Sequence, residues 1–331
     1  MAEVFTIDSH SRFEEGVRKA VALLRAGEVV ALPTETVYGL AANALDARAV
    51  QKIFEAKVRP SFNPLIVHVA SFEMIDLCAS AWPAEAARLA RQFWPGPLTM
   101  VLPATDRVPL TVTGGGPTVG LRWPSHPFMQ AVIKACGFPL AAPSANRSNE
   151  ISPSQAEHVA SSLGDRIPLI IDAGACNVGI ESTVVDLTVN PPAILRPGMI
   201  TAAQMGLTPN AKPVATTEIF KSPGMLTKHY SPRATLWIRK WKDDADLSRM
   251  LNEAGVDLGT THIIAHDHIP SQGAYKAVLL IPQDAEAYAR ALYAQLHECD
   301  LQGASLIVVE ELPPEPEWEG PRDRLNRAAA K

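Results

Sequence analysis

Apolar residues recur at helical spacing near the start of the chain. Between Phe13 and Leu24 they fall at every third or fourth position, the period of one helix face. Ser11 followed by Glu14 has the pattern of a capping box, and Gly27 is typical of a position just beyond a helix end. The pattern predicts an amphipathic helix that starts at Ser11 and packs on a sheet.

Short apolar runs alternate with amphipathic segments over the first 200 residues. Residues 28–32 form one such run, which stops at Pro33, and Asp46 is predicted to cap the helix that follows. Further strands are expected at 65–69, 98–102, 169–171 and 183–187, and helices at 84–93, 127–136 and 153–163, the last capped by Ser152. This mixture indicates an α/β domain.

The periodicity stops between 201 and 233, where four prolines interrupt the chain. We expect a linker here that lies against the first domain. From 234 to 331 the alternation returns, with strands predicted at 235–239, 261–265, 278–281 and 305–309, and helices at 243–254 and 284–297. This second region predicts a smaller Rossmann-like sheet, but it has no G-x-G-x-x-G sequence that would place a dinucleotide in it.

Composition and charge narrow the classes of protein. A net charge of −5 argues against a surface built throughout for nucleic acid, although a local basic groove would not show in this sum. The apolar runs are far shorter than the ~20 residues of a membrane span, and the first residues lack the pattern of a signal peptide. The four cysteines are scattered without a C-x-x-C pair, so we expect reduced, buried thiols in a cytoplasmic protein that does not contact membranes.

Five polar clusters follow predicted strands, where ligand-binding loops of α/β proteins lie. They combine hydroxyls, amides and fixed cations with few carboxylates, a composition that suits an anionic ligand such as a phosphate. The sequence lacks the P-loop pattern, so phosphate binding needs another arrangement. The clusters are Pro33–Gly39, Lys57–Pro60 with Asn63–His68, Thr118–Arg122, Ala142–Asn146, and Ser182–Asp186 followed by Arg196–Gly198.

Each cluster also has a structural interpretation without a ligand. Lys57 and Arg59 could serve the dipole of a helix end, and His68 could be a core histidine. Ser152 could be a helix cap only, and the glycines at 114–116 are as compatible with a turn as with a phosphate cradle.

The order of four motifs resembles the signature of the YrdC family over residues 11–200. The motifs are Pro33-Thr34-Glu35-Thr36-Val37-Tyr38-Gly39-Leu40, Lys57-x-Arg59-Pro60, Ser144-Ala145-Asn146 and Ser182-Thr183-Val184-Val185-Asp186. The stretch Ser222–Pro232 resembles the linker of the longer Sua5 branch. The resemblance implies a YrdC-like twisted mixed sheet at 11–200, a Pro-rich linker closing over the active site at 201–233, and a Sua5-type C-terminal domain at 234–331.

Members of this branch are nucleotidyltransferases that make threonylcarbamoyl-AMP. The resemblance therefore implies that L-threonine, bicarbonate and ATP are converted to L-threonylcarbamoyladenylate and diphosphate with Mg²⁺. Mg²⁺ is expected to be held through the ATP phosphates and not by protein ligands. A downstream transferase complex would pass the threonylcarbamoyl group to adenosine 37 of tRNA, and a weak tRNA contact by this chain is compatible with that role.

The resemblance also assigns residues to the two substrates. L-threonine would be bound by Thr36, His68, Arg122 and Ser182, with Arg122 forming a two-pronged pair with its carboxylate. The catalytic cations would be Lys57, Arg59 and Arg196, which neutralise charge on the leaving pyrophosphate. ATP contacts fall on Arg59, Asn63, Thr118, Ala142, Ser144, Ser152, Arg196 and Tyr230.

Two positions depart from the family pattern. Val58 and Asn149 stand where family members often have glycine, and we expect Asn149 to tolerate a left-handed backbone. The main alternative function is an RNA-binding or ribosome-associated module. A carbamoyl-transfer enzyme of hydrogenase maturation is a weaker alternative, because the paired cysteines and acylphosphatase region of those proteins are missing from this sequence.

Overall fold

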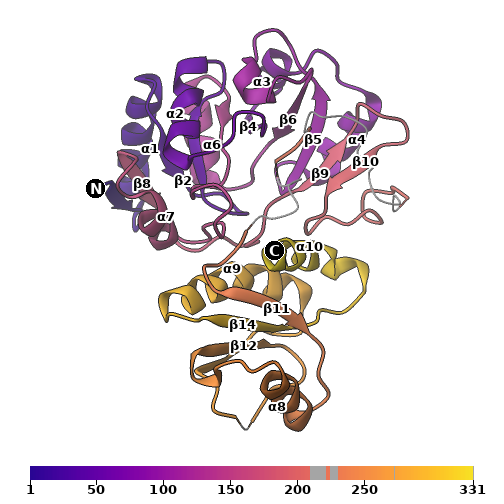
Figure 1. The fold of residues 1–331 in the computed structure, drawn as a ribbon. Coiled ribbons are helices and arrows are strands. Elements are labelled where there is room, and N and C mark those ends of the chain that lie inside the picture. Colours follow the sequence, from indigo (N-terminus) through magenta and orange to yellow (C-terminus); the bar gives the residue numbers. More distant parts are fainter. Residues whose placement is uncertain (209–220, 224–229, 272, 331) are drawn as a thin grey trace. The chain divides into compact units, whose positions relative to one another are not determined.

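The computed structural model describes residues 1–208, 221–223, 230–271 and 273–330. The chain divides into two compact units (Figure 1). The first consists of Met1–Ser148 and Ser152–Met225, and the second of Asn149–Ile151 and Leu226–Lys331. The division falls inside the predicted linker, of which residues 209–220 and 224–229 lie outside the described part of the chain. The linker's predicted closure over the active site therefore stays a prediction.

The first unit is built on one mixed sheet of 10 strands in the order β1-β8-β2-β3-β7-β4-β6-β5-β9-β10. The sheet contains parallel pairs such as β4–β6 and β5–β9 as well as antiparallel pairs such as β5–β6. The predicted α/β class with a mixed sheet is confirmed. The strands are β1 (Glu3–Thr6), β2 (Val30–Leu32), β3 (Gly39–Asn43), β4 (Ile66–His68), β5 (Leu98–Pro103), β6 (Thr118–Arg122), β7 (Leu140–Ala141), β8 (Leu169–Asp172), β9 (Thr183–Asp186) and β10 (Ala193–Arg196).

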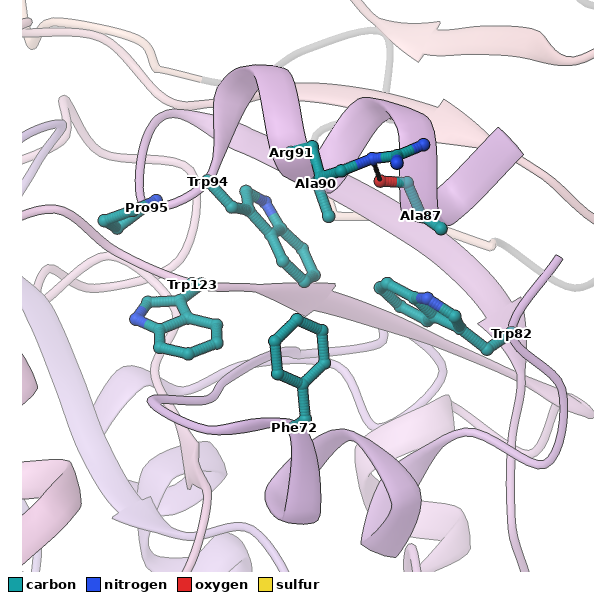
Figure 2. Close-up of a pocket in the computed structure, with 8 residues that line it drawn as sticks. All are labelled: Phe72, Trp82, Ala87, Ala90, Arg91, Trp94, Pro95 and Trp123. Atoms are coloured by element: carbon teal, nitrogen blue, oxygen red, sulfur yellow. Dashed lines mark hydrogen bonds between the residues drawn. The ribbon is translucent and has the colours of Figure 1, made fainter. Parts of the chain in front are cut away.

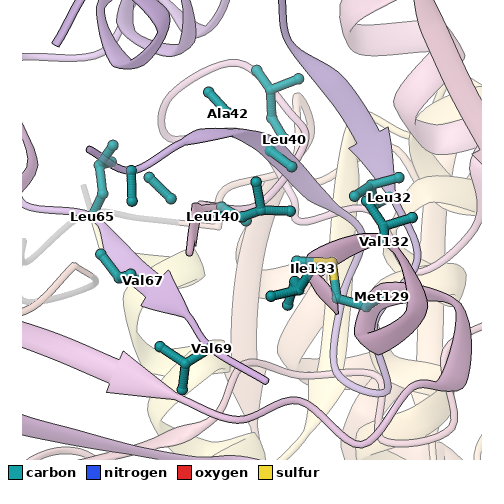
Figure 3. Close-up of a cluster of buried hydrophobic side chains, with 14 of the residues drawn as sticks. Leu32, Leu40, Ala42, Leu65, Val67, Val69, Met129, Val132, Ile133 and Leu140 are labelled. Carbon is teal, nitrogen blue, oxygen red and sulfur yellow. The ribbon is translucent and has the colours of Figure 1, made fainter. Parts of the chain in front are cut away.

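Helices of this unit pack on the sheet through buried apolar side chains. In Figure 3, Val67 of β4 and Leu140 of β7 face Val132 and Ile133 of α6 across a buried cluster. Since neighbouring residues of a strand point to opposite faces, Ile66 and His68 are turned away from this cluster. The helices are α1 (His10–Arg25), α2 (Ala47–Lys57), α3 (Phe72–Cys78), α4 (Ala84–Phe93), α5 (Leu110–Thr113), α6 (Pro127–Cys136) and α7 (Ala156–Leu163).

Two predicted helix starts are wrong. The cap of α1 is Ser9, whose side chain accepts a hydrogen bond from the Arg12 backbone, so the helix begins before Ser11. α7 begins at Ala156 with Gln155 as its cap residue, because the Ser152 hydroxyl is committed elsewhere as a donor to Glu181. Asp46 caps α2 as predicted.

The polar cluster Thr118–Arg122 is a strand and not a loop, whereas the strand predicted at 183–187 is confirmed. Thr118–Arg122 is β6, and Thr183–Asp186 is β9. Their central residues are buried and both strands pair with β5, so the backbone hydrogen bonds are satisfied inside the sheet.

The second unit has a sheet of four parallel strands in the order β11-β14-β12-β13. The predicted smaller parallel sheet is confirmed. Figure 1 shows the helix α10, which the sequence interpretation did not include; it packs against β11 and α9. The elements are β11 (Thr235–Arg239), α8 (Asp244–Glu253), a 3-10 turn (Leu258–Thr260), β12 (Thr261–Ala265), β13 (Ala277–Leu280), α9 (Ala285–Leu301), β14 (Leu306–Glu310), a second 3-10 turn (Pro316–Trp318) and α10 (Glu319–Ala329). No helix in the described ranges is long and apolar enough to cross a membrane.

Candidate functional site

The ends of four adjacent strands bring the predicted threonine-binding residues to one part of the first unit. His68 ends β4 and is the register partner of Arg122, which ends the parallel neighbour β6. Partners in register point to the same face of a sheet, so the imidazole and the guanidinium are neighbours. On the other side, β5 pairs with β6 and with β9, which begins directly after Ser182.

Arg122 is the central charged group of this site. Its side chain is about 5 % exposed, and Nη1 donates a hydrogen bond of 2.8 Å to Oγ1 of Thr36. Its Nη2 lies 2.7 Å from Oε1 of Glu35, an ion pair between two buried side chains. Nε and Nη2, which share one edge of the guanidinium, have no hydrogen-bond partner among the described residues. That edge is the geometry that binds a carboxylate with two parallel bonds.

Thr36 is held in place by its own loop. The hydroxyls of Thr34 and Thr36 are 2.9 Å apart, and Thr34 accepts hydrogen bonds from the backbone N–H groups of Thr36 and Val37. The backbone oxygen of Thr36 accepts from the N–H of Gly179. The loop after β2 is therefore fixed on both sides, and Thr36 Oγ1 is presented to Arg122 by the backbone.

His68 is a neutral imidazole at this site. It is buried, and burial, with Arg122 as a further cause, lowers its pKa to about 3. Its Nδ1 is buried without a hydrogen-bond partner among the described residues. A buried polar nitrogen with no partner is uncommon in a native core, so the interpretation as a satisfied core histidine does not fit. A ligand hydroxyl would satisfy it.

Ser182 belongs to a second hydrogen-bonded group, with Thr99 and Arg196. Its hydroxyl lies 2.8 Å from the Thr99 hydroxyl and accepts a bond of 3.1 Å from Arg196 Nη2. Arg196 also donates from Nε and Nη2 to the backbone oxygen of Ser182 and from Nη1 to that of Pro223. The structure thus joins one predicted threonine residue directly to one predicted catalytic cation.

The other two predicted cations organise backbone loops. Lys57, the last residue of α2, is buried and donates from Nζ to the backbone oxygens of Ser144 (2.5 Å) and Asn146. Arg59 donates to the oxygens of Asn63 and Pro64, at 3.1 and 2.9 Å. Helix-end dipole stabilisation alone does not explain these side chains, because both turn inward to loops that carry predicted ATP contacts.

The remaining ATP contacts of the first unit lie along the same strands. Thr118 begins β6 and Arg122 ends it, so they are separated by about 13 Å at ~3.3 Å per residue. Ala142 follows β7 and its backbone N–H donates to Ile66 of β4. Ser152 is fully buried and donates a bond of 2.5 Å to the Glu181 carboxylate.

Tyr230 belongs to the second unit, so its relation to these residues is not part of the geometry described. Within its own unit its ring lies 5.9 Å from that of Tyr293, and the Arg324 guanidinium is 5.3 Å from its centre. Its backbone has a φ of +61°, a left-handed conformation.

Sequence reasoning missed several features of the site. Glu35 and Thr99 were not assigned a role, although both contact assigned residues. The same unit has a cavity of about 400 Å³. Figure 2 shows that Phe72 of α3 and Trp94 after α4 converge there with Trp123, the residue after Arg122. Trp82 and Arg91 line it as well, and no predicted site residue does. The aromatic residues are far apart in the sequence, so no local pattern indicated the cavity.

Potential metal ligands among the described residues cluster in the second unit, and the thiols are buried. The one group of potential metal ligands among the described residues is Asp267, His268 and Glu310, in the second unit. There the Glu310 carboxylate already accepts bonds from three successive backbone N–H groups and from His268. All four cysteines are free and buried as predicted, and burial raises the pKa of Cys176 to about 12.

Comparison with known proteins gives a consistent family relationship. A family model that covers Sua5, YciO and YrdC proteins, described as "Telomere recombination", matches residues 22–198. A second, described as "Threonylcarbamoyl-AMP synthase, C-terminal domain", matches residues 194–330.

Individual relatives are similar over most of their length. Threonylcarbamoyl-AMP synthase of Pyrococcus abyssi is 41% identical over 322 residues, covering 92% of this chain and 91% of the relative. The Bacillus subtilis protein of the same name is 40% identical over 327 residues, covering 92% and 90%. The crystal structure of Pyrococcus abyssi Sua5 complexed with L-threonine has a TM-score of 0.88 and 36% identity, covering 99% of this chain and 97% of that one.

Proposed function

The chain belongs to the Sua5–YciO–YrdC family, in its Sua5 branch, and we propose from this membership and the site geometry that it is a threonylcarbamoyl-AMP synthase. It combines L-threonine, bicarbonate and ATP to give L-threonylcarbamoyladenylate and pyrophosphate. The observation that carries the proposal is the buried Arg122 guanidinium, whose Nε and Nη2 have no hydrogen-bond partner among the described residues and only an ion-pair contact with Glu35.

The threonine carboxylate binds Nε and Nη2 of Arg122. This places the amino acid next to the neutral His68, whose unpaired Nδ1 forms a hydrogen bond with the side-chain hydroxyl of threonine. Ser182, held by Arg196, is the second hydroxyl of the site. Because these groups would be left unpaired by a methyl group, valine is rejected strongly.

ATP occupies the part of the sheet nearer to Thr118, with Arg59, Asn63, Ala142, Ser144, Ser152, Arg196 and Tyr230 as its contacts. The strand length of about 13 Å between Thr118 and Arg122 suits an amino acid joined end to end with a nucleotide. Ala142 contributes its backbone only. Tyr230 would reach the nucleotide when the linker closes.

The reaction needs charge stabilisation more than proton transfer. The threonine ammonium first loses a proton to solvent, and the amine nitrogen then bonds to the carbon of bicarbonate as water leaves, giving a carbamate. A carbamate oxygen then attacks the α-phosphorus of ATP, and the bond to the pyrophosphate oxygen breaks. Lys57, Arg59 and Arg196 supply fixed positive charge along the phosphates, so preorganised electrostatics and positioning account for most of the catalysis.

Mg²⁺ fits this site as a companion of ATP. Around the cations proposed to bind the phosphates, the described residues offer hydroxyls and amides. The nearby Glu181 carboxylate accepts a hydrogen bond from Ser152. Mg²⁺ usually keeps several waters and binds phosphates with one or two carboxylates, so the ATP phosphates are its main ligands here. When bound, it neutralises phosphate charge.

The product is passed to a threonylcarbamoyl transferase complex that modifies adenosine 37 of tRNA, with at most a weak tRNA contact by this chain. No observation of the site favours the alternative of an RNA-binding or ribosome-associated module.

Pyrophosphate release tests the proposal. The purified protein, given Mg-ATP and bicarbonate, should release pyrophosphate with L-threonine and much less with L-valine, L-serine or no amino acid. Release that is absent, or independent of threonine in a folded protein that binds ATP, would contradict the proposed function.

A further inference from the structure

Glu35 places a buried carboxylate at the centre of the site. Its side chain is about 6 % exposed, and its Oε1 lies 2.7 Å from Nη2 of Arg122. The residue follows Thr34 in the loop after β2, and its backbone oxygen accepts a hydrogen bond from the N–H of Val178. The backbone of Glu35 is therefore fixed by the loop, and its carboxylate is buried and not a mobile surface group.

The Glu35 oxygens have unused hydrogen-bonding capacity. Beyond the 2.7 Å ion pair with Arg122, neither oxygen has a well-formed hydrogen bond to the residues that the structure describes, although the backbone N–H groups of Glu35 and Ser125 lie close enough to help lower its pKa. Burial would raise the pKa of Glu35, but the Arg122 guanidinium brings the pKa below its usual value, so the group is an anion at neutral pH. A buried carboxylate has room for about four hydrogen bonds, and one whose capacity is largely unused is uncommon in a native core, which points to a donor that arrives with a ligand.

We infer that Glu35 receives the α-ammonium group of the amino-acid substrate and thereby selects α-amino acids over other hydroxylated carboxylates. This inference rests on the proposed function, since it concerns the same site. It assigns to the site a residue beyond the four to which L-threonine was assigned.

The covalent structure of an amino acid supports this assignment. One carbon separates the carboxylate from the ammonium, so a ligand whose carboxylate lies on Arg122 carries its ammonium close to whatever else touches that guanidinium. Thr36 and Glu35 both touch the guanidinium, and of these two only Glu35 carries a negative charge. When the zwitterion binds, its carboxylate pairs with Arg122 and its ammonium pairs with Glu35, so each protein charge exchanges one partner for another. Because the zwitterion is neutral, no net charge is buried.

Other groups at the site cannot replace Glu35. His68 is neutral, and Thr36 and Ser182 carry no charge, so none of them balances an ammonium. The other buried carboxylates among the described residues of the first unit are Glu181 and Asp186. Glu181 accepts a hydrogen bond from Ser152, and Asp186 is paired with Lys221 at 2.8 Å.

A pair of ligands isolates the ammonium contact. L-Threonine is compared with (2S,3R)-2,3-dihydroxybutanoate, the analogue that has a hydroxyl in place of the ammonium. Both carboxylates need Arg122, so any disturbance of Arg122 weakens both ligands. Dissociation constants are measured by calorimetry at one fixed neutral pH for the full chain and for Glu35→Gln, Glu35→Asp, Glu181→Gln and Asp186→Asn.

The wild-type protein should bind threonine much more tightly than the analogue. In Glu35→Gln the threonine Kd should rise by about tenfold or more while the analogue Kd changes by less than about threefold, as expected for the loss of one buried charge partner. Glu35→Asp keeps the charge and should keep the preference for threonine. Asp186→Asn is the control for loss of a buried, paired carboxylate and should leave the preference unchanged.

Three results would overturn the inference. Equal weakening of both ligands in Glu35→Gln would make Glu35 a positioning residue for Arg122 only. If the Kd for threonine rises selectively in Glu181→Gln and not in Glu35→Gln, the ammonium is bound by Glu181 and not by Glu35. A wild-type protein that releases pyrophosphate with threonine but binds the analogue equally well would contradict the Glu35 assignment and leave the proposed function intact. This last result needs no variant to fold.

Discussion

Arg122 combines charge with a fixed shape, and its role depends on both. Nη1 of its guanidinium is hydrogen-bonded to Thr36, while Nε and Nη2 have no hydrogen-bond partner among the described residues and only the ion-pair contact of Nη2 with Glu35. Lysine at this position would keep the charge but could not make two parallel bonds to a carboxylate. We therefore expect Arg122→Lys to raise the KM for L-threonine by about two orders of magnitude, or ~2–3 kcal/mol.

Steady-state pyrophosphate release at varied threonine measures this change. Arg91→Lys, at an exposed arginine of α4 outside the site, serves as the matched control and should leave KM unchanged. An unaltered KM in Arg122→Lys would show that Arg122 does not bind the carboxylate.

His68 makes stability depend on pH. Its pKa is lowered to about 3 by burial and by Arg122, whereas an unfolded histidine has a pKa of about 6.5. Between these values the unfolded chain binds a proton that the folded chain does not, so acid favours unfolding. From pH 7 to pH 5 this one group should remove about 2 kcal/mol from the free energy of unfolding.

Urea unfolding of the wild type and of His68→Gln at both pH values tests this expectation. The variant should lose less stability than the wild type on going to pH 5, whatever its stability at pH 7. The same loss in both proteins would mean that His68 is protonated in the folded state.

Val58 is strained. It is the C-cap residue of α2 with a φ of 51°, a left-handed backbone that is unfavourable for a β-branched residue, and its side chain is exposed. Val58→Gly should therefore raise the free energy of unfolding by about 1 kcal/mol. Thermal unfolding measures the change, and Val4→Gly, at an exposed valine within a strand, should lower the melting temperature instead. A lower melting temperature for Val58→Gly would contradict the strain argument.

The helices show how far sequence patterns determine local structure. α4 and α6 have the predicted bounds, because apolar periodicity and flanking prolines agree there. The start of α1 was misplaced, because Ser9 and Ser11 are both capping residue types and only the backbone distinguishes them. The Ser9 side chain makes the capping bond, at 3.3 Å to the Arg12 N–H.

The two serines make a direct comparison. Ser9→Ala should cost about 1 kcal/mol of stability, while Ser11→Ala should cost only a few tenths of a kcal/mol, because it loses no cap. Chemical denaturation of both variants measures the difference. Equal losses of stability, or a larger loss for Ser11→Ala, would contradict the assignment of Ser9 as the capping residue of α1.

Several strands could not be predicted from local patterns. β3 and β6 contain glycine and small residues, and β7 has only two residues, so their apolar runs are weak. They are strands because neighbours on both sides pair with them, which depends on tertiary structure.

The same limit applies to the prediction of the functional site. Motif order led to Thr36, His68 and Arg122, but the pairing of Glu35 with Arg122 depends on how loops meet in space. The predicted left-handed backbone at Asn149 is confirmed, with φ at 71°.

At the scale of the whole chain, the residues assigned to the substrates are concentrated in one of the two units. The residues assigned to threonine and all but one of those assigned to ATP lie in the first unit, on one sheet. Its buried cations and hydroxyls are arranged around backbone loops, which gives a preorganised environment for an anionic ligand. The second unit has its own parallel sheet and carries Tyr230.

The most direct test of this account is to identify the product. The protein is incubated with L-threonine, ATP, Mg²⁺ and ¹³C-labelled bicarbonate, and the mixture is analysed at once by mass spectrometry. The account predicts a threonylcarbamoyl-adenylate that carries one labelled carbon, formed by the wild type and strongly reduced in Arg122→Lys. Pyrophosphate or AMP without a labelled adenylate, or a labelled adenylate formed equally well by Arg122→Lys, would contradict it.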